Sequence, residues 1–349
     1  MKTNIRAGIL GITGYAGIEL FRLLLGHPHV EITYGGTSSN AGKPIADLYP
    51  HLKGTTDLVC REIDIDAIAS ACDVVFAALP HGASCKVIPA LYEKGLRIID
   101  LSGDFRYEDP AVYKQWYDID HPAPDLLDIS VYGLPELHRA EIAKTTLIGN
   151  PGCYTTCSIL GLYPLLKMGL CDTKNIIIDA KSGVTGAGRS LSQQVHFCEC
   201  AETFKAYKIA THRHTSEIEQ ELSMAAGQDI MLSFTPHLIP AKRGILATCY
   251  ANLNGNTTQE ELVDIYKEFY KDEYFVRVYD AGELPQTGRV AGSNFVDIGI
   301  EIDKRLNRAI IVSAIDNLYK GASGQAVQNM NILFGLDEKT GIDSPGYYL

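Results

Sequence analysis

The first 26 residues contain the feature that most constrains the fold. Residues 4–11 read as a short buried strand, and a turn with Gly11, Gly14 and Gly17 follows before the helical pattern of 18–26. Small residues let the backbone approach a ligand, and the N-terminus of a helix attracts an anion. A strand, a glycine turn and a helix in this order predict a phosphate-binding turn, although the G-x-x-G-x-x-G spacing is a weak signal by itself.

Further strand-like runs place this turn in a larger sheet. They lie at 31–36, 73–79, 97–102 and 146–149, with helical or loop segments between most of them. Such alternation is typical of a doubly wound parallel sheet that binds a dinucleotide at its carboxyl edge. We therefore expect a Rossmann-type α/β domain over residues 1–150.

The pattern changes after residue 150, and a chain of 349 residues is long enough for two domains. One clear helix lies at 258–271, and strand-like runs with hairpin-like connections lie at 175–183, 230–240, 244–253, 295–302 and 308–316. This favours an α+β domain over 151–317 with a mostly antiparallel sheet, serving catalysis and oligomerisation. A final helix over 318–349 is expected to complete the first domain.

Composition excludes several kinds of protein. A formal charge of −11 argues against a nucleic-acid partner, and no apolar run reaches the roughly 18 residues of a membrane helix. Nine cysteines without regular spacing argue against a disulfide framework and for the reducing cytoplasm. His196, Cys198 and Cys200 could suggest a metal site, but without a second cluster a partly buried helix is the better interpretation, so we expect no metal.

Cys153 follows the turn sequence Gly-Asn-Pro-Gly of 149–152 and precedes the helical pattern of 155–169. The N–H groups and the dipole at a helix start favour a thiolate over a thiol. The preceding strand ends at the edge where ligands bind in such sheets. The position predicts an activated nucleophile, with a buried inert thiol as the alternative, and Cys157, one turn later, is expected in the core.

A thiolate nucleophile needs an acid/base partner, and the candidates are His212 and His214. The following helix is expected to be capped by Thr215 or Ser216, so the two histidines should lie in an extended segment with both rings near the site. We favour His214 because it is nearer the helix start. His81 is a third candidate, and structural roles are the alternative for all three.

The loop after the second strand indicates the cofactor. A site for NAD usually has a carboxylate about 20 residues beyond the glycines, where it binds the ribose 2′-hydroxyl. Here Thr37, Ser38, Ser39, Asn40 and Lys43 offer donors and no carboxylate. These groups suit a 2′-phosphate, so NADP(H) is preferred, with an ordinary capped loop as the alternative.

Several cations near the cysteine and its partners point to an anionic small-molecule substrate, because carboxylate and phosphate match the planar fork of arginine. Arg106 follows a strand of the first domain, and Arg189 lies in a glycine-rich loop at 180–190. Lys242 and Arg243 lie in a later loop. Solvated surface residues are the alternative.

These segments together resemble one known family. In order and spacing, the chain from residue 5 to about 336 is similar to N-acetyl-gamma-glutamyl-phosphate reductase of arginine biosynthesis, through GITGYAG, LPHG, DLSGDFR, GNPGCYTT, KSGVTGAGR, HRHTSEI, HLIPAKRGI, GSNFVDI and DNLYKGASGQAVQNMN. The resemblance implies NADPH-dependent reduction of N-acetyl-L-glutamyl 5-phosphate to the 5-semialdehyde, with release of phosphate. It also implies a thioester on the cysteine, a cytoplasmic location and a homo-oligomer, either dimer or tetramer.

The resemblance and the residue patterns together assign the site. The expected catalytic residues are Cys153, His212 and His214. The expected cofactor-binding residues are Gly11, Thr13, Gly14, Tyr15, Ala16, Gly17, Ser38, Ser39, Pro80, Ser182, Gly183 and Asn317. The expected substrate-binding residues are Arg106, Asn150, Arg189 and Arg213.

Several alternatives stay open on the sequence alone. Aspartate-semialdehyde dehydrogenase and a lysine-pathway enzyme acting on a carrier-linked aminoadipyl phosphate are rivals within the class. A cysteine hydrolase would not need the glycine turn, and an NADP-sensing regulator would not need Cys153. The serine loop stands where many members of the family place an arginine, and the sequence does not tell which of His212 and His214 acts.

Overall fold

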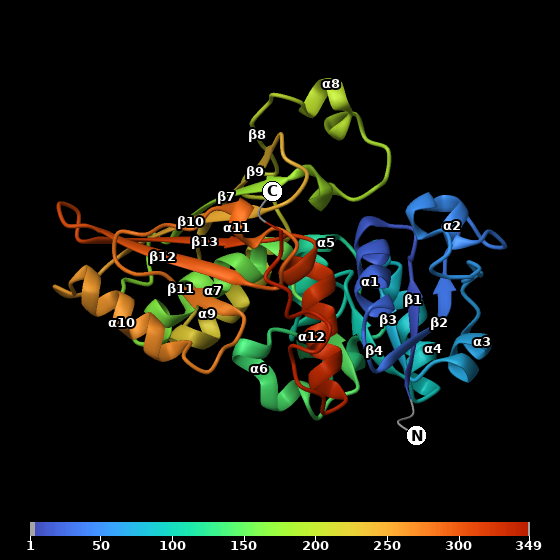
Figure 1. The fold of residues 1–349 in the computed structure, drawn as a ribbon. Helices are drawn as coiled ribbons and strands as arrows, with labels where there is room; N and C mark the ends of the chain where they lie inside the picture. The colour runs from blue at the N-terminus through green and yellow to red at the C-terminus, as the bar shows by residue number, and fades with distance from the viewer. Residues whose placement is uncertain (1–3, 348–349) are drawn as a thin grey trace. The chain divides into compact units, whose positions relative to one another are not determined.

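The computed structural model describes residues 4–347, which form two compact units (Figure 1). The first unit contains the described residues up to Pro151 together with Ala322–Asp343. The second unit contains Gly152–Gly321 and the described residues from Ser344 onward. Residues 1–3 and 348–349, which the expected domain limits include, lie outside the described residues.

The first unit is built on a six-stranded sheet in the order β2-β1-β3-β4-β6-β5. All of its ladders are parallel, which confirms the Rossmann-type prediction. The strands are β1 (Ile5–Leu10), β2 (Val30–Gly36), β3 (Val74–Ala77), β4 (Arg97–Asp100), β5 (Val131–Tyr132) and β6 (Leu147–Gly149).

Helices pack on this sheet in two groups. In one group α12 (Gly324–Leu333) contacts both α1 (Tyr15–Leu25) and α6 (Pro135–Ile142), and in the other α3 (Ile65–Ala71) contacts α4 (Ser84–Glu93). The remaining helices are α2 (Ile45–Leu48) and α5 (Pro110–Tyr117).

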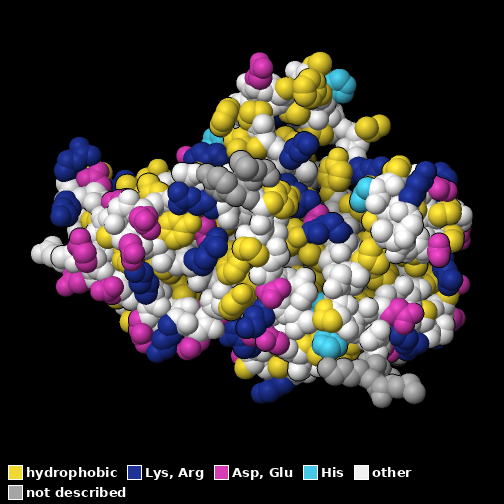
Figure 2. Space-filling model, in the orientation of Figure 1, with side chains coloured by type: hydrophobic (Ala, Val, Ile, Leu, Met, Phe, Trp, Pro, Cys, Tyr) yellow, Lys and Arg dark blue, Asp and Glu magenta, His cyan; other side chains and the backbone are white. Residues whose placement is uncertain are grey.

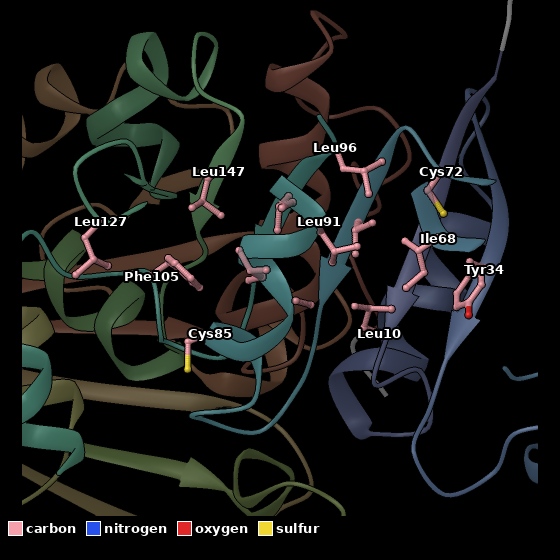
Figure 3. Close-up of a cluster of buried hydrophobic side chains, with 14 residues drawn as sticks. Leu10, Tyr34, Ile68, Cys72, Cys85, Leu91, Leu96, Phe105, Leu127 and Leu147 are labelled. Carbon is pink, nitrogen blue, oxygen red and sulfur yellow. The ribbon is translucent and has the colours of Figure 1, made fainter. Parts of the chain in front are cut away.

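One face of this sheet holds a buried apolar cluster (Figure 3). Leu10 of β1 and Ile98 of β4 meet Ile68 of α3 and Leu91 of α4 there, and all four side chains are buried. Burying such a side chain contributes about 1.5–3 kcal/mol, so the cluster holds the strands in place. The loops at the carboxyl ends of the strands can then carry ligand-binding residues on a fixed frame.

The second unit contains a seven-stranded sheet in the order β11-β12-β13-β10-β7-β9-β8. The ladders β7–β9 and β11–β12 are parallel and the others antiparallel, as expected for a mostly antiparallel sheet. The strands are β7 (Ile177–Gly183), β8 (Lys205–Ala206), β9 (Ser233–Ile239), β10 (Ile245–Asn252), β11 (Val276–Val278), β12 (Val296–Asp303) and β13 (Arg308–Ile315).

Helices α7 (Cys153–Lys167), α9 (His214–Ala226) and α10 (Gln259–Phe269) lie on one side of this sheet (Figure 1). Alternate residues of β10 are buried under them, whereas the opposite face of β7, β9 and β10 is only half-buried. We call this second face the open face. A hollow of about 350 Å³ lies on it, lined by Ile177, Asp179, Thr235, His237, Tyr250 and Arg308.

The chain between β7 and β8 projects from the sheet, away from α7, α9 and α10, and carries the short helix α8 (Phe197–Cys200) (Figure 1). Figure 2 shows apolar side chains on the surface of this arm. Leu191, Phe197 and Phe204 are all strongly exposed. Cys198 is exposed as well, so the expected partly buried helix is short and open to solvent.

The predicted helix over 318–349 is wrong in extent. A single π-helical turn at Tyr319–Ser323 leads into α12, which ends at Leu333. Gly335 then takes the left-handed conformation (φ +66°), in which a glycine ends a helix without strain. Further turns follow, and Ser344 and the described residues after it belong to the second unit.

Within residues 4–347, no helix has both the length and the apolar character required to cross a bilayer. The same residues contain no group of three or more His, Cys, Asp or Glu side chains suited to a metal ion. All nine cysteines are free thiols.

Candidate active site

Cys153 is the first residue of α7, and its side chain is partly exposed. Gly152 is the N-cap, in an extended conformation with φ −71° and ψ 155°. Gly321 packs directly against the cysteine, since a methyl group at that glycine would lie 2.8 Å from Cys153 Cβ. The thiol therefore stands at the positive end of a 15-residue helix, where a thiolate is favoured.

The imidazole of His214 lies against the backbone just before the cysteine. A methyl group at Gly152 would lie 2.7 Å from His214 Cε1 and 2.9 Å from Cδ2, and closer still to Nε2. Only glycine at position 152 admits the ring here. The structure thus places the predicted acid/base residue beside the helix start that carries the predicted nucleophile.

His212 has a different environment. Its Nδ1 accepts a hydrogen bond from the His214 backbone N–H at 3.1 Å, and its ring centroid lies 4.7 Å from that of His214. Tyr154, Tyr207 and Phe234 surround the ring at centroid distances of 5.4–5.7 Å. In this geometry Nδ1 carries no proton, because it acts as an acceptor.

The expected extended segment through both histidines is wrong. Helix α9 begins at His214, and the Thr215 N–H donates to His212 O at 3.0 Å in a turn. The physical reason is that the chain already turns before the helix: Arg213, at φ −57° and ψ −31°, is the N-cap of α9 in place of Thr215 or Ser216, and the imidazole of His212 accepts from the first helical N–H. The two rings nevertheless lie side by side.

Glu217 adds a carboxylate at the same place. Its side chain is fully buried, and Oε1 accepts from the Gly152 N–H at 2.9 Å and contacts Thr155 Oγ1 at 2.8 Å. No pattern in the sequence assigns this residue a role. Its only local signal is the three-residue spacing from His214, which puts both side chains on one side of a helix.

Two tyrosines line the same region. The Tyr207 hydroxyl donates to the Tyr154 hydroxyl at 3.3 Å, and Tyr154 donates to His237 O at 3.0 Å. Burial raises the pKa of both phenols far above the ordinary value, so both stay neutral. They act as hydrogen-bonding neighbours of the histidines.

Asn317 joins two loops of the second unit. Its Oδ1 accepts from the Gly244 N–H at 2.8 Å, and its Nδ2 donates to Thr185 Oγ1 at 2.9 Å. The Gly183 N–H also donates to Gly244 O, at 2.9 Å. Ser182 is buried, and its hydroxyl donates to Gly183 O. These contacts shape the loops that carry Ser182, Gly183 and Asn317, and their contact with a cofactor stays a prediction.

Arg243 is held by the buried carboxylate of Asp316, with Nη1 3.5 Å from Oδ2. Asp316 also accepts from the N–H groups of Gly292 and Leu318, and its carbonyl accepts from Gly321, which packs on the cysteine. Asp316 therefore connects the Arg243 guanidinium to the backbone that leads to Gly321. Of the arginines expected to bind substrate in this unit, Arg189 is exposed and Arg213 is half-buried.

The glycine turn of the first unit has the geometry that the sequence predicts. Gly11 has φ +80°, and a methyl group at Gly17 would lie 2.8 Å from Ile12 Cα. Gly14 is the N-cap of α1 and has no side chain to cap the first turn of the helix, which contains Tyr15 and Ala16. Thr13 contacts Thr37 of the next loop, with 3.4 Å between their hydroxyls.

The backbone of Arg61 pairs with the chain just before Ser38 and Ser39, a contact that sequence reasoning missed. The Thr37 N–H donates to Arg61 O at 2.9 Å, and Arg61 pairs with Gly36 at the end of β2. Both serines are exposed, and so is Arg61. Nothing in the local sequence around residue 61 indicates this pairing, because tertiary folding brings it to the loop.

Asp104 connects the two other loops expected to bind ligands. Its buried carboxylate accepts from the N–H groups of Gly82 and Cys85 at 3.0–3.1 Å and from the Tyr113 hydroxyl at 3.0 Å. The loop with Pro80 is thereby tied to the loop with Arg106. Arg106 is almost fully buried, and its Nη2 donates to Leu101 O at 3.1 Å.

Asn150 is also buried, and both ends of its amide have partners. Its Nδ2 donates to Ala322 O at 3.1 Å, and its Oδ1 accepts from Asn329 Nδ2 at 3.0 Å. These bonds fix the end of β6, and a direct contact with substrate stays a prediction.

Comparison with known proteins identifies the family. Residues 6–145 match the semialdehyde dehydrogenase NAD binding domain, and residues 153–317 match the semialdehyde dehydrogenase dimerisation domain. Among solved structures, aspartate semialdehyde dehydrogenase II of Vibrio cholerae superposes with a TM-score of 0.72 at 18% identity, covering 95% of this chain and 99% of that one. The enzyme of Candida albicans, solved with NADP, gives 0.70 at 19% identity, with the same coverage. These structural matches confirm the fold.

Sequence relatives are much closer. N-acetyl-gamma-glutamyl-phosphate reductase of Acetivibrio thermocellus is 60% identical over 342 residues, covering 98% of this chain and 99% of that protein. The protein of the same name from Symbiobacterium thermophilum is 55% identical over 344 residues, with the same coverage. Identity at this level decides against aspartate-semialdehyde dehydrogenase as the nearer group. The chain belongs to the N-acetyl-gamma-glutamyl-phosphate reductase family.

Proposed function

We propose that the chain reduces N-acetyl-L-glutamyl 5-phosphate to N-acetyl-L-glutamate 5-semialdehyde with NADPH, releasing phosphate, as a step of arginine biosynthesis. The observation that carries the proposal is the placement of Cys153 at the start of α7 with the imidazole of His214 against Gly152. The relatives at 55–60% identity supply the substrate class.

The chemistry starts with the cysteine. His214 takes the thiol proton, and the thiolate attacks the acyl carbon of the substrate. The carbon–oxygen bond to phosphate then breaks, which leaves a thioester on Cys153 and free phosphate. Backbone N–H groups in the first turn of α7 stabilise the negative oxygen of the tetrahedral intermediate, a role usually worth about 3–4 kcal/mol.

When bound, NADPH supplies the hydride that reduces the thioester to a hemithioacetal. His214 gives its proton to the oxygen and recovers it when the hemithioacetal collapses. The carbon–sulfur bond then breaks, releasing the aldehyde and restoring the thiolate. His212 lacks a proton at Nδ1, where it accepts from the His214 N–H, so it positions His214 and substrate.

The first unit fits the cofactor. The glycine turn offers an uncapped helix start for the pyrophosphate, through Gly11, Thr13, Gly14, Tyr15, Ala16 and Gly17. Ser38, Ser39 and the nearby Arg61 would hold the 2′-phosphate, since no carboxylate lies in 37–43. Pro80, Ser182, Gly183 and Asn317 would complete the site.

The anionic substrate would bind through arginines and one amide. We assign Arg106, Asn150, Arg189 and Arg213 to this role, as the sequence predicts. We add Arg243, because its guanidinium is paired with Asp316. The carbonyl of Asp316 accepts from the Gly321 N–H, and Gly321 packs against Cys153.

The domain assignment is also a proposal: residues 1–150 bind NADP, 151–317 serve catalysis and oligomerisation, and the C-terminal segment completes the first domain. The match to a dimerisation domain supports a homo-oligomer, and the open face of the sheet would form its interface. Light scattering should give two or four times the mass of one chain. Nine free thiols support a cytoplasmic location.

One assay separates the candidate functions. With N-acetyl-L-glutamyl phosphate and NADPH, the wild type should oxidise one NADPH for each phosphate released, and Cys153→Ser should do neither while still binding NADPH. Phosphate release without NADPH oxidation would indicate a hydrolase, and NADPH binding without turnover would indicate a regulator. The same assay with the aminoadipyl analogue tests the remaining rival substrate.

A further inference from the structure

We propose that Asp316 is a positioning residue that sets where the guanidinium of Arg243 stands relative to Cys153, and so determines how well the anionic substrate binds. This inference rests on the proposed function, because it takes Arg243 as a substrate-binding cation and Cys153 as the nucleophile. The carboxylate of Asp316 touches neither the substrate nor the thiol in this mechanism, and it acts through the groups that it holds.

The carboxylate of Asp316 joins four groups, two at each oxygen. Its side chain is fully buried. Oδ1 accepts from the backbone N–H groups of Leu318 and Tyr319 at 2.8 and 3.2 Å. Oδ2 accepts from the Gly292 N–H at 2.8 Å and lies 3.5 Å from Nη1 of Arg243. An ionised carboxylate offers about four acceptor positions, so these partners use its full capacity.

One oxygen shapes the wall beside the nucleophile. The two hydrogen bonds of Oδ1 fold the chain back just after β13, ahead of the π-helical turn. The Asp316 carbonyl also accepts from the Gly321 N–H at 3.0 Å. Gly321 packs on Cys153, since a methyl group at that glycine would lie 2.8 Å from the cysteine Cβ. The position of Gly321 against the cysteine therefore depends on Asp316.

The other oxygen fixes the substrate-binding cation. An arginine side chain has many rotamers, and pairing with a buried carboxylate selects among them. The loop of Arg243 is bonded to the same segment a second time, because Asn317 Oδ1 accepts from the Gly244 N–H at 2.8 Å. Both the side chain and the backbone of this loop are thus attached to residues 316–317, which lead to the turn that packs on Cys153.

Gly292 supplies the remaining donor and is itself held in place. It has φ +69°, which glycine adopts without strain. A methyl group at Gly292 would lie 2.7 Å from Cδ1 of Tyr347 and closer still to Cε1. The Tyr347 N–H also donates to Ala291 O at 3.1 Å. The loop therefore presents its N–H to Oδ2 from a fixed side, and this bond keeps Oδ2 facing Arg243.

The test separates the two oxygens. Asp316→Asn keeps one acceptor for the turn after β13 and replaces the other oxygen by an NH2 group, which repels the Gly292 N–H and the Arg243 guanidinium. Asp316→Ala removes both oxygens. Arg243→Met removes the guanidinium alone, and the double variant Asp316→Asn/Arg243→Met completes a thermodynamic cycle. For each variant, kcat, the KM for N-acetyl-L-glutamyl phosphate, the Kd of NADPH and the melting temperature are measured.

Asp297→Asn is the matched control. Asp297 is also fully buried in the second unit, and its Oδ1 accepts from Nε of Arg277 at 2.6 Å. The substitution therefore breaks a second buried pair of aspartate and arginine. It should lower the melting temperature and leave kcat and the KM for substrate unchanged.

We expect Asp316→Asn to raise the KM for substrate by about tenfold or more without changing the Kd of NADPH. In the Arg243→Met background the same substitution should change KM by less than about twofold, because no guanidinium is left to position. Asp316→Ala should in addition lower kcat by about tenfold or more, since Gly321 is no longer held against Cys153. A purely structural carboxylate would raise KM by the same factor in both backgrounds.

A wild-type KM in Asp316→Asn or in Arg243→Met would overturn the proposal, and so would equal factors in the two backgrounds. A wild-type kcat in a folded Asp316→Ala enzyme would overturn the effect on the wall beside Cys153. If the Ala variant fails to fold, the Asn variant and the cycle decide. Failure of the proposed function is distinct, since the wild type itself would then not oxidise NADPH with this substrate.

Discussion

The contact between Gly152 and His214 gives the sharpest structural prediction, through the substitution Gly152→Ala. The backbone of Gly152, at φ −71° and ψ 155°, is open to alanine without strain. The added methyl group would lie 2.7 Å from Cε1 of His214 and 2.9 Å from Cδ2. The substitution therefore acts on the imidazole and leaves the course of the chain intact.

The size of the effect follows from these distances. Carbon atoms in contact prefer separations of about 3.5–4.0 Å, so the ring must withdraw by roughly 1 Å. A displacement of about 1 Å at a reacting group can lower the rate about 10²-fold. Crowding of this kind costs about 1–3 kcal/mol of stability, so the variant should still fold. We expect kcat to fall by about 10- to 100-fold while the Kd of NADPH stays constant.

The assay measures kcat from NADPH oxidation, the Kd of NADPH from fluorescence and the melting temperature of each variant. Gly255→Ala is the control, since a methyl group there meets nothing within 4 Å and should leave all three values unchanged. A folded Gly152→Ala enzyme with wild-type kcat would refute the placement of His214 as the acid/base residue.

Three further predictions use other parts of the structure. His214→Asn should lower kcat by roughly 10²-fold or more while His212→Asn acts mainly on KM, and the reverse pattern in steady-state kinetics would transfer the acid/base role to His212. NADPH should give a higher kcat/KM than NADH, Ser38→Asp should erase or reverse that ratio by charge repulsion, and equal use of both cofactors by the wild type would contradict the 2′-phosphate site. Burial and the charge of Asp104 raise the pKa of Asp100 from 3.8 to about 6. Between these two pH values the native state holds a proton on Asp100 that the unfolded state has lost. The resulting stabilisation of the native state is therefore lost as the pH rises through 6. From pH 5 to 7.5 the melting temperature of the wild type should therefore fall relative to that of Asp100→Asn, and parallel curves would contradict the assignment.

Local sequence signals were sufficient for the main elements. The strand, glycine turn and helix of residues 5–25 were predictable because each part has a local physical requirement: a buried apolar run, small residues at close backbone contacts and an amphipathic helix. The same holds for Cys153, since a Gly-Asn-Pro-Gly turn before an apolar run indicates a helix start.

Tertiary contacts explain what the sequence did not reveal. The hydrogen bond from the His214 N–H to the His212 imidazole requires the ring to turn back on its own chain, which no helix-capping propensity of Thr215 or Ser216 indicates. Arg61 pairs with Gly36 at the end of β2, and the two residues are 25 positions apart in the chain. Glu217 meets Gly152 across 65 residues. Each of these contacts depends on how helices and strands pack.

Capture of the acyl-enzyme tests the central claim, that Cys153 carries the substrate through the reaction, most directly. The enzyme is mixed with N-acetyl-L-glutamyl phosphate without NADPH, quenched in acid and analysed by peptide mass spectrometry while released phosphate is counted. The account predicts an N-acetylglutamyl group on the peptide that contains Cys153 and one phosphate released for each active site. An unmodified Cys153 peptide, or phosphate released only after NADPH is added, would contradict it.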